Sequence, residues 1–199
     1  MTKSSSVPEA KFGQHFHAPL KGVKVVDLSH VQAGPICGMM LADMGAEVIK
    51  IESLDGDMYR GPVGGAYFQN FNRNKRSIAL DLKSKEGLQI ALDLCSKADV
   101  FLENFLPGAM NRLGLGYEAI SKLNPSIIYA SVSGFGQDGA QAKRPAFDPA
   151  IQALSGFMDS MGEADRPPVR TRTAMIDYSA GTTMAFAVAA ALFRRAKEG

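Results

Sequence analysis

The chemical group that stands out in the sequence is the carboxylate of Asp148, which is followed by Pro149 and a run of helix-forming residues. Asp before Pro is typical of a helix N-terminus, with Asp as the capping residue and Pro at the first helical position. A helix N-terminus also stabilises a carboxylate in its charged form, in which it can attack an activated carbonyl carbon. Asp148 is therefore a candidate for two roles, helix cap and covalent nucleophile, and the local sequence alone favours the cap.

A second candidate site is the loop 29–35, with the sequence Ser-His-Val-Gln-Ala-Gly-Pro, between a strand-like and a helix-like run. Free N–H groups at a helix start favour an anionic ligand, although a plain turn needs the same small residues. The loop lacks the G-x-G-x-x-G spacing of a dinucleotide site, because only Gly34 and Gly38 are present and Pro35 stands where a pyrophosphate would approach. This absence disfavours a nicotinamide-dependent dehydrogenase.

Basic and amide side chains near two further strand-like runs could meet a nucleotide-like ligand. The basic residues are Arg73, Lys75, Arg76 and Lys83. Such a cluster can bind phosphates, but a solvated rim is the commoner reason for it. Asn104 and Phe105 directly follow another apolar run, and Arg112 comes shortly after them. Phe105 fits a core position as well as a ligand contact, whereas the amide of Asn104 has no obvious packing role there.

The composition excludes several classes of protein. The 22 basic and 20 acidic residues leave a formal charge of +2 with no Lys/Arg run, so we expect no nucleic-acid partner. The most apolar stretch, 184–193, is shorter than the roughly 20 residues needed to cross a bilayer, so we expect no membrane segment. Cys37 and Cys95 show neither CxxC spacing nor neighbouring histidines, which predicts no disulfide, no metal site and a cytoplasmic location.

The elements that must position these residues follow an alternating order. Strand-like runs are predicted at 23–28, 47–52, 77–82, 100–102 and 127–132, and helices at 35–44, 84–97, 117–123, 149–158 and 177–197. This alternation predicts an α/β fold, a Rossmann-like open parallel sheet with helices on both faces. Residues 1–20 are expected to be a flexible tail and residues 21–199 a single α/β domain.

Ligands of an open parallel sheet bind beyond the carboxyl ends of its strands. Gln32, Asp81, Asn104 and Asp148 each follow or flank a predicted strand end. We therefore expect these four residues to converge at one edge of the sheet, where they would form a common site.

A series of motifs in register over residues 20–199 resembles the family III CoA-transferases, also called the CaiB/BaiF family. The motifs are Val26-Asp27-Leu28-Ser29, Ala33-Gly34-Pro35, the stretch 41–52, Gly56-Asp57-Met58-Tyr59-Arg60, the stretch 72–77, Glu103-Asn104-Phe105, Arg112-Leu113-Gly114, Asn124-Pro125, the stretch 133–136 and the stretch 147–156. A set in register is far more specific than any one motif. The stretch 30–35 is particularly similar to the formyl-CoA transferase-like members.

The resemblance implies a transferase that moves CoA from an acyl-CoA donor to a small carboxylic acid, with acyl-CoA as substrate, no permanently bound cofactor and no metal. Asp148 matches the family's catalytic aspartate. By this analogy its carboxylate attacks the donor thioester to form a mixed anhydride, and the CoA thiolate then forms an aspartyl-CoA thioester. The positions that match the family's CoA contacts are Gln32, Ala33, Leu80, Asp81, Lys83, Asn104, Phe105 and Arg112.

Three departures from the family pattern bear on these expectations. Ser53 and Ser133 replace basic residues that some members carry at matching positions. Family members also continue into a smaller domain and form interlocked homodimers. Residues 21–199 are therefore expected to be the CoA-binding and catalytic N-terminal portion of the large domain, with little activity when isolated.

Two other functions stay open at the level of sequence. An acyl-CoA racemase of the same family would need a paired acid and base, and the racemase-like members carry His where this chain has Phe147. A non-catalytic CoA-binding module is the second alternative, because the C-terminal part of the family is expected to supply part of the active site.

Overall fold

The computed structural model describes residues 18–61 and 65–198, and its centre is a five-stranded parallel sheet. The strands are β1 (Lys24–Asp27), β2 (Glu47–Glu52), β3 (Arg76–Ala79), β4 (Val100–Glu103) and β5 (Ile128–Ser131). Their order across the sheet is β3-β2-β1-β4-β5, and every neighbouring pair is parallel. This order is that of a Rossmann-like open sheet, as the alternation of elements predicted.

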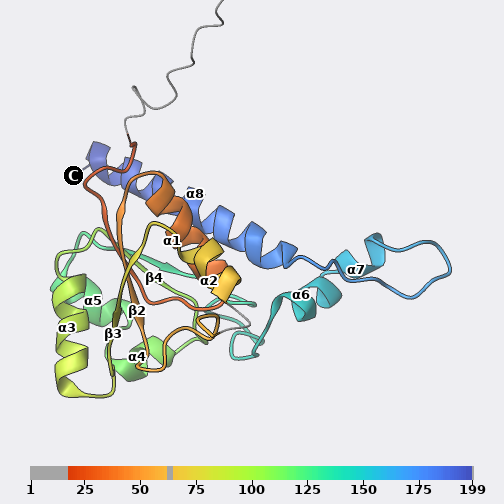
Figure 1. The fold of residues 1–199 in the computed structure, drawn as a ribbon, viewed down its shortest axis with the longest axis horizontal. Helices are drawn as coiled ribbons and strands as arrows, with labels where there is room; N and C mark the ends of the chain where they lie inside the picture. Colours follow the sequence, from red (N-terminus) through yellow and green to blue (C-terminus); the bar gives the residue numbers. More distant parts are fainter. Residues whose placement is uncertain (1–17, 62–64, 199) are drawn as a thin grey trace, which may run out of the picture.

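Helices connect the strands and cover both faces of the sheet (Figure 1). They are α1 (Ala33–Asp43), α2 (Gly65–Asn72), α3 (Lys85–Cys95), α4 (Ala109–Leu113), α5 (Tyr117–Leu123), α6 (Asp148–Leu154), α7 (Phe157–Ser160) and α8 (Met175–Glu198). Because neighbouring residues of a strand point to opposite faces, Val25 packs in the core under α1 and α8, while Val26 packs in the core under α3 and α5. The predicted fold class, with helices on both faces, is confirmed.

Helices α1 and α8 lie in close contact on one face of the sheet. A Cβ atom at Gly181 would lie 2.5 Å from the backbone oxygen of Ala33 and 2.8 Å from the Cβ of Ile36, so only glycine allows this approach. Helix α8 is long and apolar enough by composition to cross a membrane, but the core helix of a globular domain passes the same test. Here Met184 and Val188 of α8 are buried in the core.

Two predicted elements differ from the structure by more than two residues. The helix predicted at 149–158 is divided, because Gly156 adopts a left-handed conformation with φ 77° and ends the first segment. The third strand ends at Ala79, since Asp81 turns the chain by accepting a hydrogen bond from the Lys83 N–H at 2.9 Å. Residues 1–17 of the predicted tail lie outside the described residues, whereas Leu20 is bonded to the Met44 carbonyl at 3.0 Å.

The strand order creates a crevice at the carboxyl ends of β1 and β4. From β1 the chain continues to β2 and β3 on one side, and from β4 it continues to β5 on the other side. When the connections from two neighbouring strands run in opposite directions, a crevice opens between these connections. Ligands of open parallel sheets bind in this crevice. The residues that follow β1 and β4 therefore define the candidate site.

Candidate functional site

The loops that follow β1 and β4 are tied together by one side-chain amide. Asn104 accepts a hydrogen bond from the backbone N–H of His30 at 2.9 Å and donates one to the carbonyl of the same residue at 2.8 Å. The imidazole of His30 meets the ring of Phe105 edge to face, with centroids 4.5 Å apart. Asn104 therefore fixes the backbone of the β1–α1 loop, which explains a polar residue directly after a buried strand.

A cleft of about 720 Å³ opens at the carboxyl ends of β1, β2 and β3. Its lining includes Leu28, His30, Glu52, Leu54, Met58, Leu80, Asp81, Lys83, Phe105 and Leu113. Four of the predicted CoA contacts, at positions 80, 81, 83 and 105, thus surround one cavity. Its volume lies within the roughly 300–1,000 Å³ of typical small-molecule and cofactor sites.

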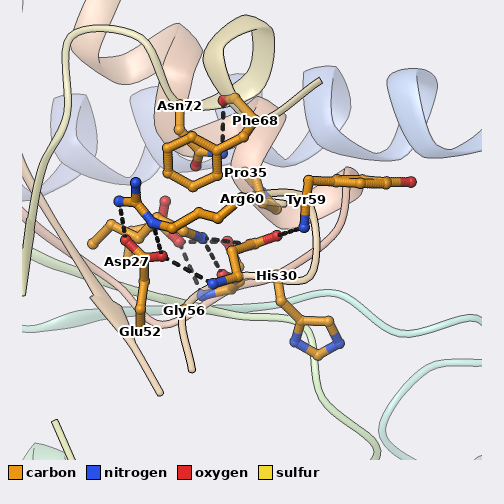
Figure 2. A network of polar contacts seen from close by, with 12 residues as sticks. Asp27, His30, Pro35, Glu52, Gly56, Tyr59, Arg60, Phe68 and Asn72 are labelled. Atoms are coloured by element: carbon orange, nitrogen blue, oxygen red, sulfur yellow. Dashed lines mark hydrogen bonds and ion pairs between the residues drawn. The ribbon is translucent and has the colours of Figure 1, made fainter. Parts of the chain in front are cut away.

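Two ion pairs, one of them fully buried, hold the wall of this cleft. The ammonium of Lys50 lies 3.1 Å from the carboxylate of Asp57, and both side chains are 1% exposed. Glu52 binds Arg60 through two hydrogen bonds, and the guanidinium of Arg60 lies 3.9 Å above the ring of Phe68. Figure 2 shows this network with the ring of His30 pointing away from it. These contacts fix the segment after β2 against the sheet.

Three of the four residues of the basic cluster pair with acidic side chains. Lys75 is buried and pairs with Asp27 at 2.8 Å, while Arg73 pairs with Asp43 and Arg76 with Glu47. Burial by itself would raise the pKa of Asp27, but the nearby charges of Lys75 and Lys50 outweigh it and lower that pKa. Of the four basic residues, Lys83 alone lines the cleft.

Asp148 lies in a separate pocket and does not cap its own helix. Phe147 occupies the N-cap position of α6, where no side-chain cap bond forms, and Asp148 is the first helical residue. Asp148 as a whole is 5% exposed, and its carboxylate accepts hydrogen bonds from the backbone N–H groups of Ile176 at 2.7 Å and Asp177 at 3.0 Å. The sequence-based assignment of the cap is therefore corrected: Asp148 caps the N-terminus of α8.

A single glutamine connects Asp148 with the segment that precedes α8. Gln152, which is 1% exposed, donates from Nε2 both to Oδ1 of Asp148 and, at 3.0 Å, to the hydroxyl of Thr171. Its Oε1 accepts the backbone N–H of Thr171, also at 3.0 Å. The spacing of four residues places Gln152 one helical turn beyond Asp148. This arrangement fixes the orientation of the carboxylate.

The pocket around Asp148 has a volume of about 190 Å³. Its lining consists of Val31, Gln32, Tyr59, Phe147, Asp148, Pro149, Arg170, Thr171, Arg172, Thr173, Ala174 and Asp177. Within residues 18–61 and 65–198, no hydrogen bond uses the side-chain amide of Gln32, so this donor is available to a ligand. The pocket therefore combines a fixed carboxylate with a free hydrogen-bond donor.

Sequence reasoning did not identify Asp177, the second acid of this pocket. Its pKa is raised from 3.8 to about 6, first by burial and then by the negative charge of Asp148. An acidic residue in the first turn of a helix is common and complements the helix dipole, so the local sequence carried no signal for this role. Only the approach of α6 to α8 brings the two carboxylates together.

The β1–α1 loop lies between the cleft and the Asp148 pocket. His30 lines the cleft, Gln32 lines the pocket, and Val31 between them has φ 65°. A left-handed conformation is a true outlier for a β-branched residue and costs about 1–3 kcal/mol, which the surrounding structure must offset. The strained residue thus turns the chain from one cavity to the other.

Three further predicted positions lie near these cavities without lining the cleft. Ala33 is the first residue of α1, directly after Gln32, and Asn104 contacts the loop backbone as described. Arg112 is exposed on α4, beside the cleft-lining Leu113. In the part of the chain that the structure describes, no group of three or more His, Cys, Asp or Glu side chains is arranged to hold a metal ion.

Comparison with known proteins gives one consistent result. A family model described as CoA-transferase family III matches residues 20–199. The chain is 46% identical over 188 residues to the acetyl-CoA:oxalate CoA-transferase of Acetobacter aceti, covering 91% of this chain and 48% of that protein. It is 43% identical over 188 residues to the succinyl-CoA:glutarate CoA-transferase of Mus musculus, covering 91% of this chain and 43% of that protein.

A solved structure extends the likeness to the fold. The crystal structure of a CAIB/BAIF family protein from Brucella suis aligns with a TM-score of 0.87 at 42% identity, covering 90% of this chain and 50% of that chain. The chain thus spans about half the length of the relatives that it matches.

Proposed function

The chain belongs to CoA-transferase family III, and we propose that the protein containing it moves CoA from an acyl-CoA to a carboxylic acid with Asp148 as the covalent nucleophile. The observation that carries this proposal is the position of the β1–α1 loop. It separates a cleft large enough for a nucleotide-bearing thiol from a small pocket that holds a fixed carboxylate. A thioester bound along the loop would reach from one cavity into the other.

In the proposed reaction, every step is acyl transfer. The carboxylate of Asp148 attacks the thioester carbonyl, the C–S bond breaks, and a mixed anhydride and a CoA thiolate form. The thiolate attacks the aspartyl carbonyl carbon, which releases the donor acid and leaves an aspartyl-CoA thioester. The acceptor carboxylate attacks this thioester to form a second anhydride, and the returning thiolate takes the new acyl group. Asp148 is regenerated without net proton transfer.

The surrounding residues have supporting roles in this scheme. The backbone N–H groups of Ile176 and Asp177, with the amide of Gln152, hold the Asp148 carboxylate in one orientation before attack. The free amide of Gln32 is the proposed donor to the oxyanion that develops on the thioester carbonyl. His30, Leu80, Asp81, Lys83 and Phe105 are the proposed contacts of CoA in the cleft.

Trapping of the enzyme-bound thioester tests this proposal. The protein is incubated with acyl-CoA and hydroxylamine, and the peptide containing Asp148 is analysed by mass spectrometry. Hydroxylamine should displace CoA and leave a hydroxamate on Asp148, and borohydride should reduce the same carbonyl. The peptide with the exposed Asp138, which cleavage after Lys143 separates from Asp148, is the internal control. Modification elsewhere, or none in a protein that turns over, would contradict the assignment.

One observation supports a second candidate function, that of an acyl-CoA racemase. Asp177, with its pKa raised to about 6, provides a second titratable group beside Asp148, as an acid–base pair requires. A racemase would exchange the proton α to the thioester with solvent. Incubation in D₂O with a chiral acyl-CoA and no acceptor distinguishes the two, because transfer alone leaves the α-hydrogen in place. Deuterium at this carbon would favour the racemase.

We also propose, from the family resemblance alone, a cytoplasmic homodimer with acyl-CoA as substrate and no permanently bound cofactor. Light scattering of the purified gene product that contains this chain tests the assembly. A monomer mass over the whole accessible concentration range would contradict the dimer.

A further inference from the structure

We propose that Lys75 is a positioning residue of the transfer reaction, whose buried ammonium clamps the two ends of the β1–α1 loop and so holds Gln32 beside Asp148. The inference rests on the proposed function, since Gln32 is the proposed oxyanion donor of that reaction. It deepens this function, because it gives a role in the reaction to a residue that lines neither the cleft nor the Asp148 pocket.

The ammonium of Lys75 has three acceptors, as many as it has N–H groups. It donates to Oδ2 of Asp27 and to the backbone carbonyl of Pro35, both at 2.8 Å, and to the side-chain oxygen of Asn72 at 2.9 Å. These three partners are labelled in Figure 2. The side chains of Lys75 and Asp27 are 1% and 0% exposed. All three N–H groups are therefore used inside the protein.

Two of these acceptors lie at opposite ends of the β1–α1 loop. Asp27 is the last residue of β1, and Pro35 lies in the first turn of α1. Helix α1 also lies directly against the ion pair, since a Cβ atom at Gly38 would be 2.5 Å from Oδ2 of Asp27 and 3.1 Å from Nζ of Lys75. One ammonium group thus fixes the separation between the end of the strand and the start of the helix.

Other side chains fix the first half of the loop. Oδ1 of Asp27 accepts the backbone N–H of Ser29 at 3.0 Å, and the ammonium of Lys50 donates to the carbonyl of Ser29 at 2.6 Å. Asn104 binds both the N–H and the carbonyl of His30. The backbone from the end of β1 to His30 is therefore held on both sides.

Val31 and Gln32 lie between this fixed stretch and the Lys75 contact at Pro35. The left-handed conformation of Val31, with φ 65°, persists only where the surrounding structure imposes it. The carbonyl of Gln32 accepts the N–H of Ile36 at 2.8 Å, so Gln32 is joined to the first turn of α1. The position of the Gln32 side chain is thus set by the helix end that Lys75 binds.

Stability by itself gives little reason for an ion pair at this place. Desolvation of two buried charges offsets much of their attraction, and apolar residues of similar volume are often as stabilising. An ammonium can hold a carboxylate, a backbone carbonyl and an amide oxygen in one arrangement, which an apolar side chain cannot. The contacts of Lys75 therefore favour a role in the geometry of the loop.

The first test separates stability from positioning in the gene product that contains this chain. Lys75→Met leaves Asp27 buried without its cation, so the melting temperature should fall. Asp27→Asn/Lys75→Met removes the uncompensated charge and should recover most of the melting temperature, but the contact with Pro35 is still missing. We expect kcat to be roughly 10- to 100-fold below wild type in both variants, because a small misplacement of a reacting group costs that much.

Ile120→Val is the matched control for a loss of stability without a contact to the loop. Ile120 lies in α5 and is fully buried in the core under α3 and α5. Its substitution should lower the melting temperature and leave kcat within about threefold of wild type. A kcat that recovers together with the melting temperature in Asp27→Asn/Lys75→Met would overturn the proposal, and so would an equal loss of kcat in Ile120→Val.

A double-mutant cycle tests whether Lys75 acts through Gln32. Gln32→Ala removes the proposed oxyanion donor, which should lower kcat roughly 100- to 1,000-fold. If Lys75 acts by positioning this amide, Asp27→Asn/Lys75→Met should lower kcat by less than about threefold more when it is combined with Gln32→Ala. A full further loss of 10- to 100-fold would show that the two residues act independently, which contradicts the proposal.

Amide hydrogen exchange without substrate separates this inference from the proposed function. Peptides that cover residues 28–36 should exchange faster in Asp27→Asn/Lys75→Met than in wild type, while peptides of α5 should not change. If hydroxylamine trapping at Asp148 fails while the loop is released in this variant, the transferase mechanism is wrong but the clamp stands. If trapping succeeds and the loop exchanges as in wild type, the inference is wrong and the transferase mechanism stands.

Discussion

The backbone N–H of Ile176 donates to the carboxylate of Asp148 at 2.7 Å, across 28 positions of sequence. The proposed nucleophile therefore also satisfies one of the free N–H groups at the start of α8. The two roles that the sequence offered for Asp148, cap and nucleophile, coexist in one residue, but the capped helix is α8 and not α6. Any substitution of Asp148 must be interpreted with both roles in mind.

Asp148→Asn separates the two roles. Asparagine retains an oxygen that can accept from Ile176 or Asp177, so we expect a loss of about 1–2 kcal/mol in the free energy of unfolding. Without the attacking carboxylate, acyl transfer should fall by at least about a thousandfold. Urea denaturation and steady-state kinetics measure the two effects. A variant with normal turnover would exclude Asp148 as the nucleophile.

Gln152→Glu tests whether Gln152 orients the nucleophile. The change puts a second carboxylate within hydrogen-bond distance of Asp148 and replaces an attractive contact with repulsion. We expect kcat to fall roughly 10- to 100-fold, with partial recovery at lower pH as one carboxylate takes up a proton.

Gln89→Glu is the matched control for this substitution. Gln89 forms the same kind of glutamine–aspartate contact with Asp93, four residues away at 2.8 Å, on the exposed face of α3. The Gln89→Glu substitution should leave kcat unchanged and shift the free energy of unfolding by less than about 0.5 kcal/mol. Equal kinetic effects of the two variants would show that Gln152 does not act through Asp148.

Asp177→Asn should change how stability depends on pH. The pKa of Asp177 is raised to about 6 in the folded protein, so near pH 5 the folded chain holds a proton that the unfolded chain has released. Wild type therefore gains stability from this group as the pH falls and loses it as the pH rises through about 6. After allowance for solvent screening, the variant should be about 1–2 kcal/mol more stable than wild type at neutral pH.

The difference between Asp177→Asn and wild type should disappear below about pH 4, where both side chains are neutral. Chemical denaturation at a series of pH values measures it. Asp159→Asn, at an exposed position of α7, is the control and should show no such change. A constant difference at all pH values would mean that Asp177 does not titrate near pH 6.

Gly181→Ala tests the contact between α1 and α8. The added methyl group would lie 2.5 Å from the Ala33 carbonyl oxygen, so the helices must separate, at a cost of about 1–3 kcal/mol. Ala33 directly follows the loop residue Gln32, which is the proposed oxyanion donor. Transferase activity should therefore fall as well. Thr182→Ala, at the next and exposed position, should be nearly neutral in thermal denaturation. Equal melting temperatures of the two variants would contradict the close contact.

Lys50→Met removes one partner of a buried ion pair. Asp57 would be left buried without its cation, which should cost about 3–5 kcal/mol. Further substitution of Asp57 by Asn should recover part of this loss, since it removes the uncompensated charge. Lys24→Met, at an exposed strand position, is the control. A double variant less stable than Lys50→Met would contradict the pairing.

The residue pattern within short segments of the sequence predicted most of the fold. β-branched runs alternating with helical stretches predict a parallel sheet, and the rule that ligands meet the carboxyl ends of its strands places the loops after β1, β3 and β4 at one edge. The structure has this sheet, and positions 80, 81, 83 and 105 line one cleft at that edge. The sheet was predictable because each strand and helix depends on residues close together in the sequence, whereas positions 80, 81, 83 and 105 were expected from the family resemblance.

Long-range contacts decided the rest of the site. The sequence showed Lys75 in a basic cluster that was either a solvated rim or a phosphate contact, but its pairing with Asp27 depends on the approach of two segments 48 residues apart. The local sequence favours Asp148 as the cap of the helix that it begins. In the structure its carboxylate accepts from the backbone N–H of Ile176, at the start of α8, at 2.7 Å.

Asp177 shows no local pattern that marks a site, and it lines the Asp148 pocket because the chain returns to α6 before α8 begins. Periodicity reports which face of an element is buried, since that depends on neighbours in sequence. The partner of a charged side chain depends on which elements meet in space, so tertiary structure alone assigns it.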